Sequence, residues 1–147
     1  MAAIPFTDRE MQRAWRINLQ ASNQTSRTNA HRLLLFYAIE CGLKAILMKR
    51  QSVNCSSDCR EIGEAQHNIN KLLDALSAGK SLKLPSQFHI DPINIKGLKQ
   101  ERKIDPGTIN QMWRYGGTMV DKNLTDQDLE THLTKISDWI QKELDHS

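Results

Sequence analysis

The chain has 147 residues, with 20 Lys and Arg against 17 Asp and Glu and a net charge of +3. This length is typical of a single domain over residues 1–147, with enough chain to bury a core. No uncharged apolar stretch is long enough to cross a membrane, and no run of Lys and Arg marks a polyanion-binding tail, so both classes are excluded.

The charges are nevertheless distributed unevenly. Residues 1–50 hold eight Lys and Arg against three Asp and Glu, whereas residues 101–147 hold six against nine. Such a distribution suits either a basic end that binds nucleic acid or oppositely charged helix surfaces that help a bundle close or dimerise. The second interpretation is favoured because the basic residues are scattered.

Two helices are predicted in the first third of the chain. Thr7 and Glu10 form a capping box, which begins a helix that runs to about Asn23. The almost continuous apolar segment 33–48 is too long for one strand, so it predicts a second helix, buried on most of its circumference, that ends near Arg50.

The middle of the chain alternates polar segments with one helix. Residues 51–64 are expected to form a surface loop, and residues 67–78 a third helix with an apolar face of Ile and Leu. Residues 80–105 contain Pro92 and Gly97, and they are expected to form a long connection with one helical turn after Pro92.

Two further helices complete the predicted fold. A short fourth helix begins at Asp105-Pro106 and ends near Tyr115, before two glycines. Thr125, with Asp128 three residues later, caps the fifth helix. The expected fold class is all-α, an up-and-down bundle of about five helices.

The three cysteines predict no metal site and no disulfide. Cys41 lies in the buried helix and is expected to pack as a small apolar residue. Cys55 and Cys59 form a C-x3-C pair, but a zinc site needs two more ligands at suitable spacing. Residues Met1–Thr7 show no secretory signal, so we expect a cytoplasmic protein with free thiols and no cofactor.

Three segments carry a resemblance to a known family. They are the apolar helix with Glu40 and Lys44 one turn apart, the start His67-Asn68-Ile69 of the third predicted helix, and the pair Arg114-Tyr115. In this order they resemble the HEPN superfamily over roughly residues 10–145. The resemblance implies a bundle of about five helices that often forms a homodimer or docks a partner protein. It also implies that Glu40, Lys44, His67, Arg114 and Tyr115 bind RNA or a nucleotide.

Many members of this superfamily are ribonucleases with an Arg-x(4–6)-His motif near the start of a late helix. In these enzymes histidine acts as a general acid or base, and arginine stabilises the charge that develops on phosphorus. No histidine follows Arg114 at this spacing. The spacing recurs only in Arg60-x6-His67, which crosses a loop and is interpreted as a chance match.

Each candidate also has a purely structural interpretation. Glu40 and Lys44 have the spacing of an ordinary i,i+4 ion pair. Trp113-Arg114-Tyr115 is either a cluster that stacks on bases or the end of a helix with Trp113 in the core.

The sequence therefore predicts a HEPN-like binding or partner-docking module without catalysis, of a prokaryotic defence or toxin–antitoxin type. One alternative is a metal-independent ribonuclease that acts as a dimer, with His67, Arg114 and Arg60 as catalytic candidates. The other is a helical adaptor or immunity protein with no role in nucleic acid binding.

Overall fold

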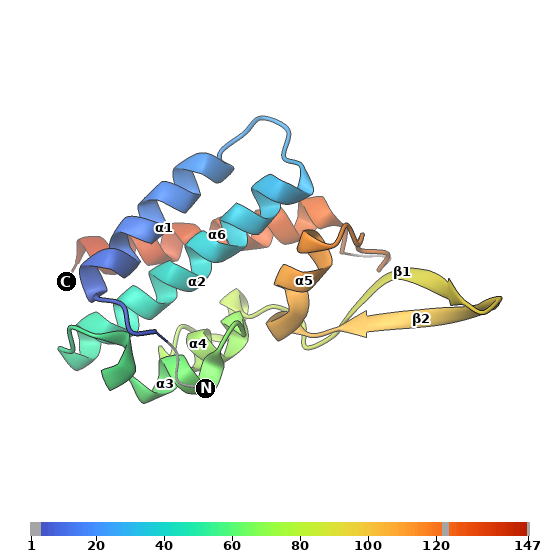
Figure 1. Ribbon diagram of the computed structural model, residues 1–147. Helices are drawn as coiled ribbons and strands as arrows, with labels where there is room; N and C mark the ends of the chain where they lie inside the picture. Colours follow the sequence, from blue (N-terminus) through green and yellow to red (C-terminus); the bar gives the residue numbers. More distant parts are fainter. Residues whose placement is uncertain (1–3, 122–123, 147) are drawn as a thin grey trace.

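The computed structural model describes residues 4–121 and 124–146. The prediction that Met1–Thr7 holds no secretory signal falls partly outside these residues. Helix α2 (Asn29–Gln51) is the axis of the molecule. Helix α1 (Asp8–Ser22) and helix α6 (Asp126–Asp145) pack along it, as Figure 1 shows. The shorter helices α3 (Arg60–Ala65), α4 (Ile69–Ala75) and α5 (Ile109–Arg114) also contact α2.

The apolar segment 33–48 forms most of α2, as predicted, and its side chains are the centre of the core. Its buried residues are Leu35, Phe36, Ala38, Ile39, Glu40, Gly42, Leu43, Ala45, Ile46, Leu47 and Met48. Gly42 lies where three helices meet, because a Cβ atom there would be 2.8 Å from Cγ2 of Ile140 and 3.0 Å from Cε3 of Trp15. The missing side chain therefore lets α1 and α6 approach the middle of α2.

The predicted helix starts are confirmed at both ends of the chain. The side chain of Thr7 accepts from the backbone N–H of Glu10, and the Glu10 carboxylate accepts from the backbone of Thr7. Thr125 and Asp128 form the same reciprocal pair at the start of α6. In both capping boxes, side chains satisfy backbone N–H groups that have no partner inside the helix.

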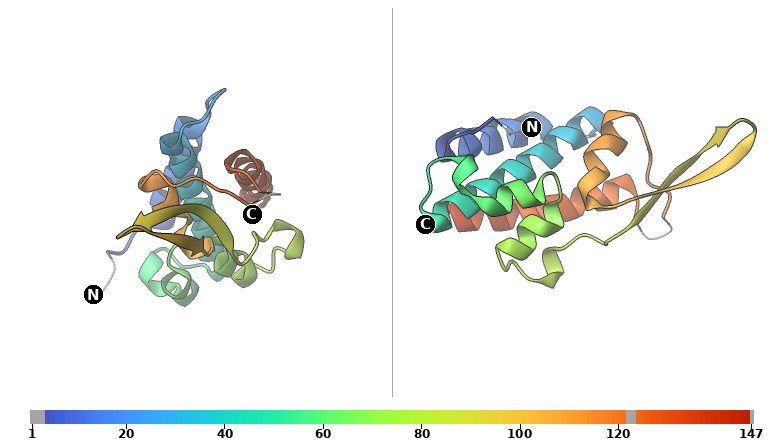
Figure 2. Two further views of the ribbon diagram at one scale, coloured as in Figure 1. Left: turned by 90° about the vertical axis from the view of Figure 1, so that its right-hand side faces the viewer. Right: turned by 60° about the horizontal axis from the view of Figure 1, so that its bottom comes forward.

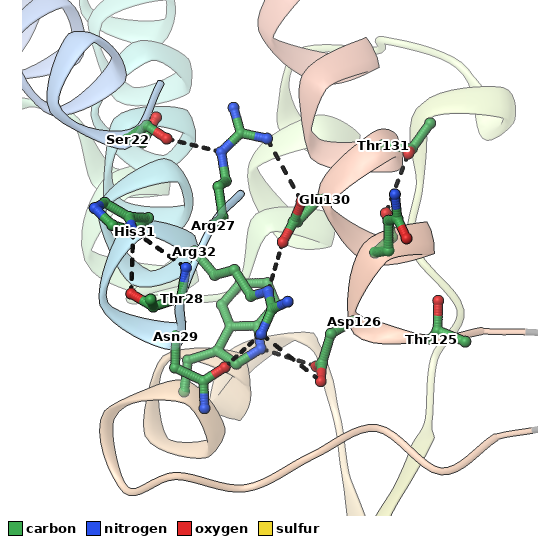
Figure 3. A network of polar contacts seen from close by, with 12 residues as sticks. Ser22, Arg27, Thr28, Asn29, His31, Arg32, Thr125, Asp126, Glu130 and Thr131 are labelled. Atoms are coloured by element: carbon green, nitrogen blue, oxygen red, sulfur yellow. Dashed lines mark hydrogen bonds and ion pairs between the residues drawn. The ribbon is translucent and has the colours of Figure 1, made fainter. Parts of the chain in front are cut away.

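A network of ion pairs joins the start of α2 to the start of α6 (Figure 3). Arg32 donates from Nε to the Glu130 carboxylate, and Nη1 of Arg27 lies 3.6 Å from the other oxygen of Glu130. Trp113, on α5, donates from Nε1 to Asp126 at 3.0 Å. Basic residues of the N-terminal third thus meet acidic residues of the C-terminal third within one chain. This contact supports the second interpretation of the uneven charge, in which opposite surfaces close the bundle.

The predicted all-α fold class is wrong. The described residues form six α-helices and an antiparallel hairpin, β1 (Phe88–Ile95) and β2 (Leu98–Ile104). The hairpin occupies the segment that we expected to be a long connection with a helical turn after Pro92. It extends away from the helices in Figures 1 and 2. Only its base reaches the core, through Phe88 and Ile90, which are buried.

Local chemistry explains why the hairpin forms in spite of its proline and glycine. Pro92 lies at a bulge, where the register shifts between Ile90 and Ile93, so its missing N–H breaks no regular pair. Lys96 and Gly97 both have positive φ, 53° and 82°, which is the backbone of a type I′ turn. Lysine is uncommon in the first position of a type I′ turn, so the pair Lys96-Gly97 is only a weak indication of a hairpin in the sequence.

Two other segments differ from their predicted boundaries. The expected loop 51–64 contains the first residues of α3, and the third predicted helix is shorter, beginning at Ile69 and ending at Ala75. Among residues 4–121 and 124–146, the longest apolar helix still falls short of what a membrane crossing requires.

Candidate functional site: the polar face of helix α2

One face of α2 carries the polar residues that the core does not use. Tyr37, Glu40 and Lys44 are spaced three and then four residues apart, which places them on one side of a helix. Tyr37 and Lys44 are partly exposed, whereas Glu40 is buried, with 7% of its surface exposed. We call these three residues the polar face of α2.

Glu40 holds two nitrogen donors at once. Nζ of Lys44 donates to Oε2 of Glu40 at 2.9 Å, and Nδ1 of His67 lies 2.9 Å from Oε1. Because a carboxylate only accepts, Nδ1 of His67 must carry its proton. The structure thus brings together three of the predicted site residues, and both oxygens of the carboxylate are occupied.

His67 reaches Glu40 from a sharp turn between α3 and α4. Gln66 ends α3 with a φ of 53°, and Asn68 then caps α4 by accepting from the backbone N–H of Lys71 at 3.2 Å. His67 lies between these two residues, and about half of its side chain (54%) is exposed. Nε2 of His67 has no hydrogen-bond partner among the described residues, so it is available to a ligand.

Arg114 and Tyr115 lie at the end of α5, against the same face. Arg114 donates to the hydroxyl of Tyr37, and this hydrogen bond raises the pKa of Arg114 above its usual value. The guanidinium carbon lies 6.0 Å from the centre of the Tyr115 ring, which is 77% exposed. A cation beside an exposed aromatic ring offers both a phosphate contact and a stacking surface.

Arg60 is not part of this arrangement. Its side chain is 81% exposed and pairs with its helix neighbours, at 3.4 Å to Glu64 and 4.0 Å to Glu61. His67 bonds Glu40 instead. The sequence spacing Arg60-x6-His67 therefore has no counterpart in contacts within the chain.

Two adjacent hollows open beside these residues. The first, of about 320 Å³, is lined by His67, Lys71 and Asp105 among others, and we call it the His67 hollow. The second, of about 660 Å³, lies between the hairpin and α5 and includes Tyr115, and we call it the hairpin hollow. Thr108 lines both hollows, so the two are neighbours on one surface.

Several residues of this surface were missed in the sequence. Thr108 lies in a polar segment with no motif, and Lys71 lies on the polar side of the third predicted helix. The position of both depends on how α4 and the turn before α5 pack. Asn110 is also unexpected, because it is 4% exposed and its side-chain oxygen has no hydrogen-bond partner. Asn110 lies in the first turn of α5, a few residues before Arg114. The sequence around Asn110 mixes polar and apolar residues, so it gives no signal that this side chain is buried.

The cysteines take no part in the site. Burial raises the pKa of Cys41 to about 11, which keeps its thiol protonated at neutral pH. Cys55 and Cys59 are free thiols in the segment before α3. Within the described ranges, no three His, Cys, Asp or Glu side chains are placed to hold a metal ion.

The arrangement offers two kinds of chemistry. A carboxylate that orients an imidazole leaves the other ring nitrogen free for proton transfer, as in carboxylate–histidine pairs of enzymes. The Arg114–Tyr115 pair instead offers binding without a reaction. No protein-family model, curated protein or solved structure matches the chain.

Proposed function

We propose that this chain is a binding module for RNA or a nucleotide and that it does not cleave its ligand. The observation that supports this most directly is the position of Arg114, held by Tyr37 beside the exposed ring of Tyr115 at the hairpin hollow. Stacking on an aromatic ring, next to a cation that meets phosphate, binds single strands with little dependence on sequence. As part of the same proposal, the chain is a relative of the HEPN superfamily and acts in a prokaryotic defence or toxin–antitoxin system.

The candidate catalytic groups are each held by a different residue of α2, which supports binding over cleavage. Arg114 is bonded to Tyr37, whereas His67 is bonded to Glu40, and the two side chains share no contact within the chain. A ribonuclease of the implied type needs an arginine and a histidine at the same phosphate.

A second candidate function has one specific observation in its favour. Glu40 orients His67, and His67 lines the His67 hollow with its Nε2 free of any partner among the described residues. A second copy of the chain that supplied an arginine to this hollow would complete a metal-independent ribonuclease. The third candidate, an adaptor or immunity protein, needs neither feature.

The binding proposal is tested by titrating a fluorescently labelled single-stranded RNA with the purified protein and measuring anisotropy. Stacking contributes about 1–3 kcal/mol per base, so Tyr115→Ala and Arg114→Ala are each expected to weaken binding about tenfold. Arg9→Ala is the matched control, because Arg9 is an exposed cation on α1 that bonds no other described residue. Its affinity is expected to stay near that of the wild type.

The outcomes separate the three candidates. An equal loss in Arg9→Ala and Arg114→Ala would show only nonspecific attraction, and no binding at all would favour the adaptor. Cleavage is measured on the same RNA in EDTA, with wild type and His67→Ala. We expect no cleavage above background, and cleavage that disappears in His67→Ala would make the ribonuclease correct.

A further inference from the structure

The outer edge of β2 is an open strand edge with no partner among the described residues. Leu98 pairs with Ile95 across the two-residue turn, so their backbone groups face each other. Residues in an antiparallel strand alternate between facing the partner and facing away. The backbone N–H and C=O groups of Lys99, Glu101 and Lys103 therefore point away from β1.

The other edge of the hairpin, on β1, is closed at its base. The backbone N–H of Asp91 donates to the carbonyl of Thr118 at 2.9 Å, and Val120 donates to the carbonyl of His89 at 3.0 Å. Nearer the tip, Pro92 has no N–H to offer. Beyond Pro92 the backbone of Asn94 also faces outward from β1, so β2 offers the longer open edge of the hairpin for strand pairing.

The side chains of β2 favour one self-pairing over the others. In antiparallel pairing of two β2 strands centred on Gln100, Lys99 of each copy lies opposite Glu101 of the other, and no like charges meet. Centring on Lys99 or on Glu101 instead sets that residue opposite itself, and centring on Arg102 sets two arginines face to face. Opposite charges across strands stabilise a sheet, and like charges destabilise it.

We propose that a second copy of this chain binds along β2, antiparallel and centred on Gln100, to form a four-stranded sheet across a two-fold axis. The same alternation places Ile93, Ile95 and Leu98 on one face of the hairpin, where they are 38%, 48% and 68% exposed. In this pairing the aliphatic stem of Arg102 from one copy covers Leu98 of the other. The proposal is independent of the proposed ligand.

The charge pattern is tested by sedimentation equilibrium of the full chain. Lys99→Glu and Glu101→Lys each replace two attractions with two repulsions, so each is expected to raise the dimer dissociation constant about tenfold or more. The double variant restores opposite charges and is expected to return the constant to near the wild-type value. Lys103→Glu is the matched control, because it makes the same change in charge but faces Gly97 in this register.

The register is tested independently with a disulfide. Gln100 faces itself across the axis in a pair without backbone hydrogen bonds, where side chains are close enough to cross-link. In a Cys55→Ser background, Gln100→Cys is expected to form a covalent dimer on mild oxidation. Lys96→Cys, in the exposed turn and away from the axis, is expected to remain monomeric.

Three results would overturn the proposal. The first is a wild-type chain that stays monomeric at its highest soluble concentration. The second is a double variant no better than either single variant, and the third is a Lys103→Glu variant as weak as Lys99→Glu. If the chain is monomeric and Lys99→Glu lowers RNA affinity instead, the β2 edge binds nucleic acid. Unfolding midpoints of the variants distinguish lost pairing from lost folding.

Discussion

At the scale of a single residue, Glu40 combines two roles. Its carboxylate is buried within the apolar helix and balances Lys44 and His67, both at 2.9 Å. A buried charge of this kind is retained only when its partners compensate for the loss of water. The polar face of α2 is therefore part of the stability of the fold as well as a candidate site.

Replacing this carboxylate predicts a specific loss. Glu40→Gln keeps the size of the side chain but leaves Lys44 and His67 without a charged partner, so the free energy of unfolding is expected to fall by about 1–3 kcal/mol. Urea denaturation followed by circular dichroism measures this change.

The control for this variant is Glu64→Gln, which removes an exposed carboxylate that pairs with Arg60. Its effect is expected to stay within about 0.5 kcal/mol, as for other exposed ion pairs. Equal effects at the two positions would contradict the role given to Glu40.

The sequence revealed half of this cluster. The spacing of Glu40 and Lys44 predicts their ion pair, because residues four apart always meet on a helix. His67 comes from 27 residues further along, and its direction depends on the turn at Gln66, whose φ is positive and which no local pattern encodes. Arg114 likewise reaches Tyr37 only through the packing of α5 on α2.

At the scale of elements, the crossing of α1, α2 and α6 depends on Gly42. Glycine is a poor helix former, and alanine at an ordinary helix position stabilises by about 0.5–1 kcal/mol. The Cβ atom of Gly42→Ala would instead meet Ile140 at 2.8 Å and Trp15 at 3.0 Å. We expect the variant to lose about 1–3 kcal/mol of unfolding free energy.

Gly63→Ala is the matched control for this effect. Gly63 also lies in a helix, α3, but a Cβ atom there meets nothing within 4 Å. This variant is expected to be slightly more stable than the wild type, as measured by thermal unfolding. The same sign at both positions would mean that helix propensity, rather than the close crossing, decides the result.

The difference between predicted and observed elements follows from the range of their signals. The capping boxes at Thr7 and Thr125 involve residues three apart, and both were read correctly. The hairpin depends on pairing between segments and on a bulge that accommodates Pro92, and its Lys-Gly turn lacks the usual Asn-Gly signature. An isolated pair of strands is also marginal by itself, so its base needs the core that holds Phe88 and Ile90.

At the scale of the whole molecule, the helical body and the hairpin separate into a packed part and an exposed part. Residues 92–101 are all exposed. Replacing them with Gly-Ser-Gly keeps the pair of Ile90 with Arg102 at the base. We expect the shortened chain to retain its helical circular dichroism and to change its unfolding free energy by less than about 1 kcal/mol.

The same variant lacks Lys99, Gln100 and Glu101 of the β2 edge, so it is also expected to be monomeric in sedimentation experiments. A shortened chain that loses cooperative unfolding would show that the hairpin contributes to the core. A shortened chain that still dimerises would place the interface on the helices.

The packing of α6 on α2 has a consequence during synthesis of the chain. The apolar side of α2 is complete once Gln51 has been made, but α6, which covers it, extends to Asp145. At about 5–20 residues per second, the ribosome takes on the order of ten seconds to make the intervening chain. Throughout that interval the side of α2 that α6 covers stays exposed, because α1, α3, α4 and α5 pack on other parts of the helix. We therefore expect the nascent chain to expose, until α6 is made, an apolar helix surface of the kind that chaperones bind.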